Sequence, residues 1–411
     1  MASEDGRARI VIVGGGFGGL FTALNLAGAG EVTMVSAENH FLFKPMLYEY
    51  MSGEVEAWHI APYYKELLDD GVQFIHAEAT GVDFDARKVE VNFDGRVGDI
   101  EYDLLVLALG NVTNYWNVEG AAEHALPVRT IADADALRRR MMDALDRIPP
   151  EAAPQDAQRA ATFVVVGGGA SGVELATKMS DLLRDAFRRR GLRGEPRVLL
   201  VEMAAQIVPG MNDDIREAVE EALREKRVEI HTETRVVRVT SEGVALEHGG
   251  EEVVGAAGVV WVAGVRPSPL VEKLEVEKDR RGYVAVEPTL QVRDRPEVFA
   301  LGDIAAFRPV VPSLAGTAQL AFQQSDLCAA NVQAVLDGSV PGTRHFEELG
   351  EAVSLGTENA AVLAAGHVQT GALAREARFA LYTSRLPTWQ HRLRVGASWF
   401  FGSRRPRPLV D

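Results

Sequence analysis

Several stretches of the chain are unbroken runs of apolar residues, the pattern of strands buried on both faces of a parallel sheet. Residues 10–13, 104–109 (within the strand expected at 103–109) and 163–166 are three such runs. After the first and the third, apolar residues recur at helical spacing. Strand-then-helix alternation predicts an α/β fold built on parallel sheets.

Two of these strands are followed by glycines in G-x-G-x-x-G spacing: Gly14, Gly16 and Gly19, then Gly167, Gly169 and Gly172. In such a turn the first glycine bends the chain tightly and the second lets a pyrophosphate approach the backbone. The third lets the helix pack closely on the strand. Bare N–H groups at the helix N-terminus then favour phosphate. Two such turns predict two bound dinucleotides.

The two glycine turns belong to a longer internal repeat. The separations are 153 residues from Gly14 to Gly167, 155 from His76 to His231 and 154 from Gly110 to Gly264. Near-constant spacing indicates one architectural unit used twice. His76 and His231 are therefore interpreted as matching strand positions and not as ligands.

The acid expected after the second strand of each unit differs between the two copies. Glu202 follows residues 197–201 and would hold an adenosine ribose. No arginine follows it closely, which favours NADH over NADPH. In the first unit the equivalent position is Ser36 and the nearest acid is Glu38, so either Glu38 or Ser36 with a water would serve.

Local signals mark further elements. Thr130 and Asp133 form a capping-box variant that predicts a helix through residue 145, and Gly191 is a candidate C-cap of the second glycine-turn helix. Residues 315–330 predict a helix with Gln319 and Gln323 on one face. The aromatic segment 39–50 is either a packed loop and helix start or a neighbour of a flat aromatic cofactor.

Composition narrows the class of protein. A net charge of −16 argues against non-specific nucleic-acid binding. Cys328 is the single cysteine, which excludes an internal dithiol pair, and its apolar surroundings predict a buried side chain. We recognise no metal-ligand motif. The short polar N-terminus predicts no signal or transit peptide, and no run approaches the ~20 apolar residues that span a bilayer.

The C-terminal region is basic in an acidic chain, with eight arginines against two acids from Arg375 onward. Apolar residues recur there at helical spacing, and arginines flank them: Leu386, Trp389, Leu393, Ala397 and Phe400, with Arg392, Arg394, Arg404, Arg405 and Arg407. This pattern favours a helix lying in a membrane interface. The alternative is the interface of a homodimer with a basic rim.

These residues resemble the two-dinucleotide-binding-domain flavoproteins and, within them, the type II NADH:quinone oxidoreductases. The motifs are residues 11–19 (VIVGGGFGG), 41–48 (FLFKPMLY), 102–110 (YDLLVLALG), 164–175 (VVVGGGASGVEL), 261–264 (WVAG), 298–303 (VFALGD) and 318–324 (AQLAFQQ). Residues 46–62 and 381–396 are similar to a subgroup with cyanobacterial and plastid enzymes that reduce naphthoquinones.

The resemblance implies two Rossmann-like domains, the second inserted in the first. Residues 1–119 and 285–340 would form the FAD-binding domain, and residues 120–284 would form the NAD(P)H-binding domain. Residues 341–411 would form a membrane-surface or dimerisation region. The implied FAD contacts are Gly14, Gly16, Phe17, Gly18, Gly19, Ser36, Glu38, Lys44, Pro45, Ala108, Gly110, Gly302, Asp303, Ala318 and Gln319. The implied NADH contacts are Gly167, Gly169, Ala170, Ser171, Gly172, Glu174, Glu202, Ala263 and Gly264.

The resemblance also implies catalytic roles for Glu174, Lys44, Gln319 and Gln323 beside the flavin and the quinone, which would be menaquinone or a related naphthoquinone. From their opposite charges we expect Lys44 and Glu174 to form a buried pair. The implied location is the cytoplasmic face of the cell membrane, bound peripherally. Two other functions fit the pattern: a soluble reductase of a ferredoxin- or rubredoxin-like carrier, and a redox sensor like apoptosis-inducing factor.

Overall fold

The computed structural model describes residues 6–307, 316–364, 366–401 and 406–409. The chain forms two compact units. The first contains residues 1–43, 61–112 and 265–349, and the second contains residues 44–60, 113–264 and 350–411. Both units are therefore discontinuous in sequence, and each is described by itself.

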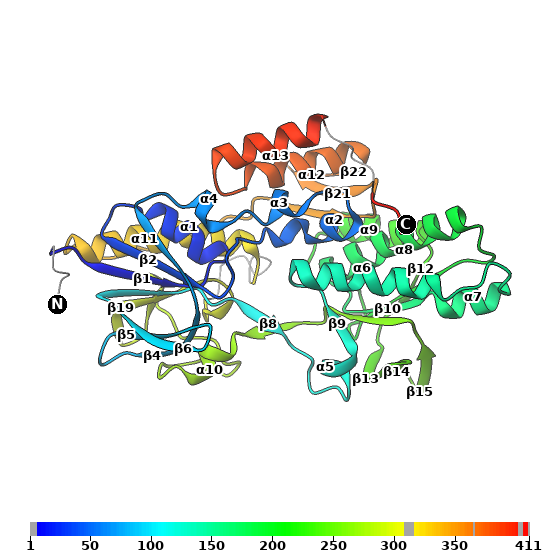
Figure 1. Cartoon of the computed structure of the whole chain (residues 1–411), viewed down its shortest axis with the longest axis horizontal. Coiled ribbons are helices and arrows are strands. Elements are labelled where there is room, and N and C mark those ends of the chain that lie inside the picture. The colour runs from blue at the N-terminus through cyan, green and yellow to red at the C-terminus, as the bar shows by residue number, and fades with distance from the viewer. Residues whose placement is uncertain (1–5, 308–315, 365, 402–405, 410–411) are drawn as a thin grey trace. The chain divides into compact units, whose positions relative to one another are not determined.

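The first unit is built on a six-stranded sheet in the order β18-β19-β7-β1-β2-β3. The strands are β1 (Arg9–Val13), β2 (Glu31–Ser36), β3 (Val72–His76), β7 (Leu104–Leu107), β18 (Gln291–Val292) and β19 (Arg295–Ala300). β1 lies parallel to β2 and β7 and is buried from Ile10 to Val13, because both faces of the sheet are covered. Helices α1 (Phe17–Asn25) and α11 (Ala318–Leu336) pack against each other (Figure 1).

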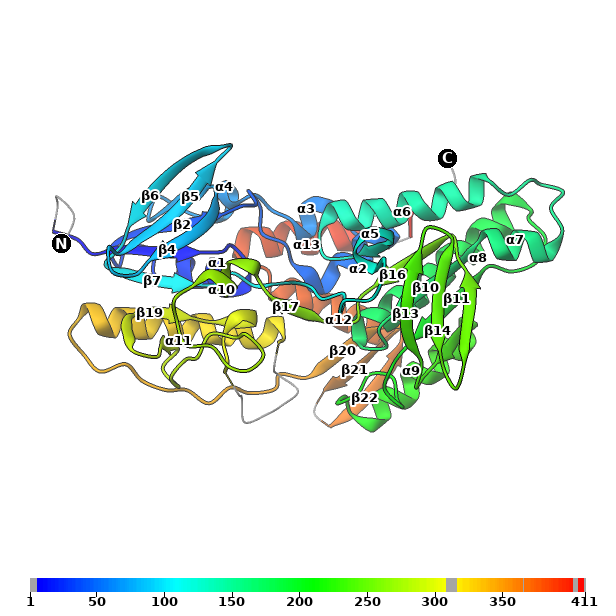
Figure 2. The ribbon, with the colours of Figure 1, turned by 90° about the horizontal axis from the view of Figure 1, so that it is seen from below.

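The second unit repeats this plan with a five-stranded sheet in the order β12-β11-β10-β16-β9. Its three central strands, β11, β10 and β16, are labelled in Figure 2. The strands are β9 (Ala125–Pro127), β10 (Thr162–Val166), β11 (Arg197–Val201), β12 (Val228–His231) and β16 (Gly258–Trp261). β10 lies parallel to β11 and β16, as β1 does to β2 and β7. The predicted internal repeat is confirmed, with His76 and His231 at the ends of the matching strands β3 and β12.

Each unit also carries a three-stranded antiparallel sheet. In the first unit these strands are β4 (Glu78–Asp83), β5 (Lys88–Phe93) and β6 (Arg96–Glu101); in the second they are β13 (Arg235–Thr240), β14 (Gly243–Glu247) and β15 (Glu251–Gly255). Short elements complete the core: α4 (Tyr64–Leu67), β8 (Asn111–Thr113), α5 (Ala121–His124), β17 (Val265–Pro267), α10 (Pro269–Lys273) and η2 (Gly302–Ile304).

The long helices of the second unit begin and end where local signals predict. α6 (Ile131–Asp146) starts at a capping box in which Thr130 and Asp133 bond each other's backbone N–H. α8 (Ala170–Arg190) ends at Gly191, which has φ +64°. Two further helices of this unit are α7 (Pro154–Ala160) and α9 (Asp213–Glu225).

Segments from both ends of the sequence join the second unit. They are η1 (Lys44–Met46), α2 (Leu47–Ser52), α3 (Ala57–Ile60), β20 (Glu351–Ser354), β21 (Ala360–Ala364), β22 (His367–Gly371), α12 (Ala372–Ser384) and α13 (Trp389–Phe401). α12 and α13 pack side by side (Figure 1). No helix in the described part of the chain has both the length and the apolar character needed to cross a membrane.

The division of the chain differs in position from the one expected. After the long segment 113–264, the chain returns to the first unit at Val265, whereas the expected boundary is Ala285. The reason is that Leu270, Val271 and Leu274 are buried in the core of the first unit with Val89. Residues 350–411 are part of the second unit, where a separate terminal region was expected.

Candidate functional site

The glycine turn of the first unit is dictated by backbone crowding. Gly14 has φ +108°, and a Cβ atom there would lie 2.3 Å from the carbonyl oxygen of Ala108. A Cβ on Gly19 would lie 1.8 Å from the oxygen of Gly14. Gly16, in contrast, faces open space. The middle glycine therefore leaves room for a phosphate where α1 begins.

The second turn has the same construction. Gly167 has φ +113°, and a Cβ there would lie 2.9 Å from the Cα of Ala263. A Cβ on Gly172 would lie 1.8 Å from the oxygen of Gly167, while Gly169 again has nothing within 4 Å. Each unit therefore offers one cradle that fits a dinucleotide pyrophosphate.

The groups that follow the second strand of each sheet are held differently. Both carboxylate oxygens of Glu202 accept backbone hydrogen bonds, from the N–H of Gly168 at 2.6 Å and of Ala204 at 2.8 Å. In the first unit the Oγ of Ser36 accepts from the N–H of Glu38 at 3.3 Å. The side chain of Glu38 is exposed. Which of these two residues meets a ribose stays a prediction.

Near Gly302 the structure reveals a residue that sequence reasoning missed. The buried Gln324 accepts from the N–H of Gly302 at 2.8 Å, while its own Nε2 has no hydrogen-bond partner among the described groups. Asp303 accepts from Nδ2 of Asn111 at 2.6 Å. The orphaned amide donor beside Gly302 and Asp303 fits a bound polar chain such as that of a flavin. The available signal in the sequence was the second glutamine of the run AFQQ, which stands among apolar positions of the predicted helix.

The two glutamines predicted on one face of α11, Gln319 and Gln323, have different surroundings. Gln323 is buried, and its amide forms two bonds with the backbone of Glu347, donating to the oxygen at 2.8 Å and accepting from the nitrogen at 3.0 Å. Gln319 and Ala318 are half-buried at the start of the helix. Phe41 and Phe43 are buried and pack against the half-buried Phe17, and η1 and α2 follow them, as a packed loop and helix start would have it. That segment 39–50 also lies beside a flat cofactor stays a prediction.

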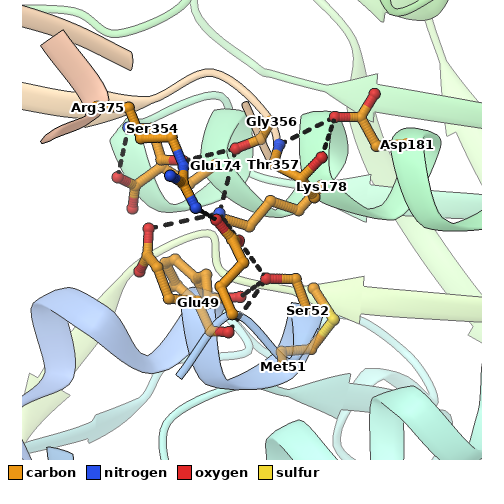
Figure 3. Close-up of polar contacts among 12 residues, drawn as sticks. Glu49, Met51, Ser52, Glu174, Lys178, Asp181, Ser354, Gly356, Thr357 and Arg375 are labelled. Carbon is orange, nitrogen blue, oxygen red and sulfur yellow. Dashed lines mark hydrogen bonds and ion pairs between the residues drawn. The ribbon is translucent and has the colours of Figure 1, made fainter. Parts of the chain in front are cut away.

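Glu174 lies in a buried cluster of charges in the second unit (Figure 3). It extends from the first half of α8 and is 7% exposed. Its Oε1 accepts from the N–H of Ser354 at 2.8 Å and from Nη2 of Arg378 at 2.7 Å. The other end of the Arg378 guanidinium donates to Oε1 of Glu49 at 2.6 Å. Arg378 thus joins two carboxylates from distant parts of the chain.

One helical turn further along α8, Lys178 is completely buried. Its Nζ contacts Glu54, lies 3.4 Å from Oε1 of Glu49 and donates to the oxygen of Gly356 at 3.1 Å. Arg375 donates to the second oxygen of Glu54 at 3.1 Å. Three carboxylates thus face three cations, of which only Arg375 is partly exposed, and each buried charge depends on its partners.

Burial and neighbours set the protonation of this cluster. Burial raises the pKa of Glu174 to about 7, against the opposing effect of Arg378 and with the support of the nearby Glu49 charge. For Glu49 burial also acts upward, but Arg378 and Lys178 outweigh it, and its pKa is lowered. Burial acts to lower the pKa of Lys178, but Glu54 and Glu49 raise it. A carboxyl group with such a pKa can take up or release a proton near neutral pH.

The prediction that Lys44 forms a buried pair with Glu174 is wrong, because Glu174 is buried with a different cation. Lys44 is exposed in η1, and the buried cation on Glu174 is Arg378. The sequence signal for the cluster was Lys178, a charge among the apolar positions of the predicted helix. In the sequence, Arg375 and Arg378 stand at the start of the basic C-terminal region, where nothing local links them to Glu174.

The C-terminal helix presents an apolar stripe to solvent. Trp389, Leu393 and Phe400 are exposed on α13. Leu386, expected on the same face, precedes the helix and is completely buried. Arg404 and Arg405 lie outside the described residues.

Comparison with known proteins was informative at the level of family. The model of the pyridine nucleotide-disulphide oxidoreductase family matches residues 8–325. The demethylphylloquinone reductase NdbB of Synechocystis is 37% identical over 99% of this chain and 98% of its own. The alternative NAD(P)H-ubiquinone oxidoreductase C1 of Arabidopsis thaliana is 33% identical over 97% of this chain and 81% of its own. The type II NADH:quinone oxidoreductase Ndh of Mycobacterium tuberculosis is 32% identical over 84% and 76%.

Solved structures extend the likeness to the fold. NDH2 from Plasmodium falciparum in complex with NADH matches with a TM-score of 0.86 and 17% identity, covering 98% of this chain and 100% of that one. The sulfide:quinone oxidoreductase of Aquifex aeolicus matches with a TM-score of 0.76 and 20% identity, over 94% and 92%. The expected two-domain dinucleotide-binding fold is confirmed.

Proposed function

Because the chain belongs to the pyridine nucleotide-disulphide oxidoreductase family and, within it, to the type II NADH:quinone oxidoreductases, we propose that it oxidises NADH and reduces a membrane quinone. The observation that carries the proposal is the pair of matching glycine turns, one in each unit, each with open space at its middle glycine. With a single cysteine in the chain, no internal dithiol pair can carry the electrons. FAD, held in the first unit, supplies hydride and electron-pair chemistry that protein side chains lack.

The chain's own residues bind and orient. Gly14, Gly16 and Gly19 with the α1 N-terminus hold the FAD pyrophosphate, while Gly302, Asp303 and Gln324 meet its polar chain. Gly167, Gly169 and Gly172 with Glu202 hold NADH. The fixed carboxylate of Glu202, which no arginine follows closely in the sequence, favours NADH over NADPH.

In the proposed reaction, Glu174 holds or releases a proton. Reduction of a quinone to a quinol consumes two protons, and a carboxyl group whose pKa lies near 7 can hold or release one at working pH. Arg378 and Ser354 fix the orientation of that carboxyl group. We assign Gln319 and Gln323 of α11 and Lys44 to the surroundings of the quinone and the flavin.

The proposed quinone is a naphthoquinone of the menaquinone class, in line with the demethylphylloquinone reductase among the relatives. Such a substrate resides in a membrane, and the exposed stripe of Trp389, Leu393 and Phe400 gives α13 an apolar face for the interface. We propose peripheral binding at the cytoplasmic face of the cell membrane, with a homodimer interface as the competing use of that stripe.

A visible spectrum of the purified protein tests the electron path. We expect flavin absorption that bleaches on anaerobic addition of NADH and returns on addition of a menaquinone analogue. A colourless protein that flavin cannot reconstitute contradicts the proposal. Bleaching that only an added ferredoxin reverses would favour a soluble carrier as the acceptor. Turnover with the quinone below about 1 per second would favour a redox sensor.

Vesicle sedimentation tests the membrane face. The double variant Leu393→Glu/Phe400→Glu should lower partitioning onto anionic vesicles at least about tenfold, because negative charges replace the apolar side chains that would enter the membrane interface. Val97→Glu, an equally drastic change at an exposed apolar residue of β6, is the control and should bind as the unmodified protein does. If the double variant instead dissociates a dimer and vesicle binding is unaltered, the stripe is a subunit interface.

A further inference from the structure

Trp116 in the second unit has a backbone conformation that its side chain does not favour. Its φ is +52°, and Asn117 beside it has φ +55°. The left-handed region is unfavourable for bulky residues, so such strain persists only where surrounding contacts enforce it, commonly at functional sites. Here Oδ1 of Asn114 accepts from the N–H of Trp116 at 3.0 Å and supports the turn.

The indole ring is fixed although it is 63% exposed. Its Nε1 donates to the carbonyl oxygen of Ala263 at 2.6 Å. A Cβ atom on Gly264 would lie 3.0 Å from the same nitrogen and 3.1 Å from Cζ2 of the ring, so the ring packs directly on the Gly264 backbone. A large aromatic side chain is thus held against the backbone of Ala263 and Gly264 while most of its surface stays exposed.

The segment that holds the ring adjoins the second glycine turn. Ala263 follows β16 and lies against Gly167, because a Cβ atom added to Gly167 would lie 2.9 Å from the Cα of Ala263. β16 and β11 flank β10 on opposite sides, and Glu202 follows β11. A dinucleotide crossing the carboxyl edge of this sheet, with its pyrophosphate at Gly169, places its adenosine over β11 and its other half over β16.

We propose that Trp116 forms an aromatic wall of the NADH pocket and packs against the nicotinamide half of the bound dinucleotide. The inference rests on the proposed function and names a binding residue for it. The exposed indole face matches a flat, uncharged dihydronicotinamide ring, since aromatic faces pack favourably on planar groups. The hydrogen bond to Ala263 orders the ring in advance, so little side-chain entropy is lost on binding.

Calorimetry on the FAD-loaded protein with two ligands tests this assignment. Tetrahydro-NADH carries a nicotinamide-derived ring but cannot donate a hydride, and ADP-ribose lacks that ring altogether. Trp116→Ala should weaken binding of tetrahydro-NADH about tenfold and leave ADP-ribose within about twofold. Trp116→Gly should behave in the same way, and it relieves the left-handed strain, which guards against misfolding of the alanine variant.

Two controls sharpen the experiment. Trp116→Phe keeps a ring without the Nε1 donor and should retain most of the affinity for tetrahydro-NADH. Trp58→Ala removes another partly exposed indole, from α3, and should change neither affinity. Equal weakening of both ligands, or no weakening of tetrahydro-NADH in a folded Trp116→Gly protein, overturns the inference. A wild-type protein that binds neither ligand contradicts the proposed function itself.

Discussion

The helices that follow the two glycine turns, α1 and α8, begin alike and then serve different purposes. Positions 153 residues apart correspond, as Gly14 and Gly167 do, so Phe21 of α1 is the counterpart of Glu174 and Asn25 that of Lys178. Phe21 packs in an aromatic cluster with Phe322 of α11, at a ring separation of 4.7 Å. Glu174 and Lys178 instead enter a buried set of ion pairs.

This difference separates what the phosphate cradle requires from what the rest of the helix can be. The first turn of each helix is constrained by the backbone contacts of Gly19 or Gly172. Beyond it, the two copies differ at corresponding positions: α1 buries the aromatic ring of Phe21 where α8 buries the carboxylate of Glu174 among otherwise apolar side chains. Apolar packing stabilises without depending on pH, whereas buried charges make stability and proton affinity depend on each other.

Removing Lys178 should have the largest effect on this contrast. Lys178→Ala leaves Glu49 and Glu54 with less positive charge in a solvent-free site, so we expect a loss of about 3–5 kcal/mol in the free energy of unfolding. Urea denaturation measures it. Asn25→Ala, at the corresponding position of α1, is the matched control. A loss below about 1 kcal/mol for Lys178→Ala would show that the cluster tolerates an unpaired carboxylate.

Glu174→Gln should remove a pH dependence worth about 3 kcal/mol, the equivalent of raising its pKa from 4.5 to about 7. Between these values the folded protein holds a proton that the unfolded chain releases, so stability falls as pH rises from about 4.5 to 7. Urea denaturation from pH 5 to pH 8 should show this decline in the wild type and a flatter profile in the variant. Parallel profiles would contradict the raised pKa.

Gly16→Ala and Gly169→Ala should separate the two cradles by ligand. Each added methyl group enters space that the structure leaves open, so folding is unaffected, but a phosphate can no longer approach. We expect at least about tenfold weaker FAD retention for Gly16→Ala and at least about tenfold weaker NADH binding for Gly169→Ala, about 1.4 kcal/mol each. Flavin absorbance and dinucleotide titration measure the two. The reverse pattern would exchange the ligands between the units.

Asn25→Ala should have the smallest effect, within about 0.5 kcal/mol, because its hydrogen bond to Asp326 at 2.9 Å lies at the surface. Thermal melting with the Lys178→Ala protein alongside checks it. A large destabilisation would mean that the corresponding positions of the two helices carry similar weight after all.

Signals that lie close together in sequence were enough to predict much of the fold. The glycine spacing, the buried runs and the repeat separation predict both sheets, and Thr130 with Asp133 predicts the start of α6. These features depend on backbone geometry within a few residues, which the local sequence determines.

The charged cluster could not be derived in the same way. It brings together α2, α8 and α12, whose charged residues are far apart in the sequence. The expected partner of Glu174, Lys44, had the right charge, but tertiary packing selected Arg378. Similarly, Gln324 and Gln323 differ by one position, and only the rotation of α11 decides which of them contacts Gly302.

The buried thiol of Cys328 on α11 has a consequence for an enzyme that handles quinones. Quinones are electrophiles that arylate thiolates, and the thiolate is the reactive form of cysteine. Burial raises the pKa of Cys328 far above its usual range, and its side chain is completely shielded from solvent. The chain's single thiol is therefore protected from arylation by the quinone substrate.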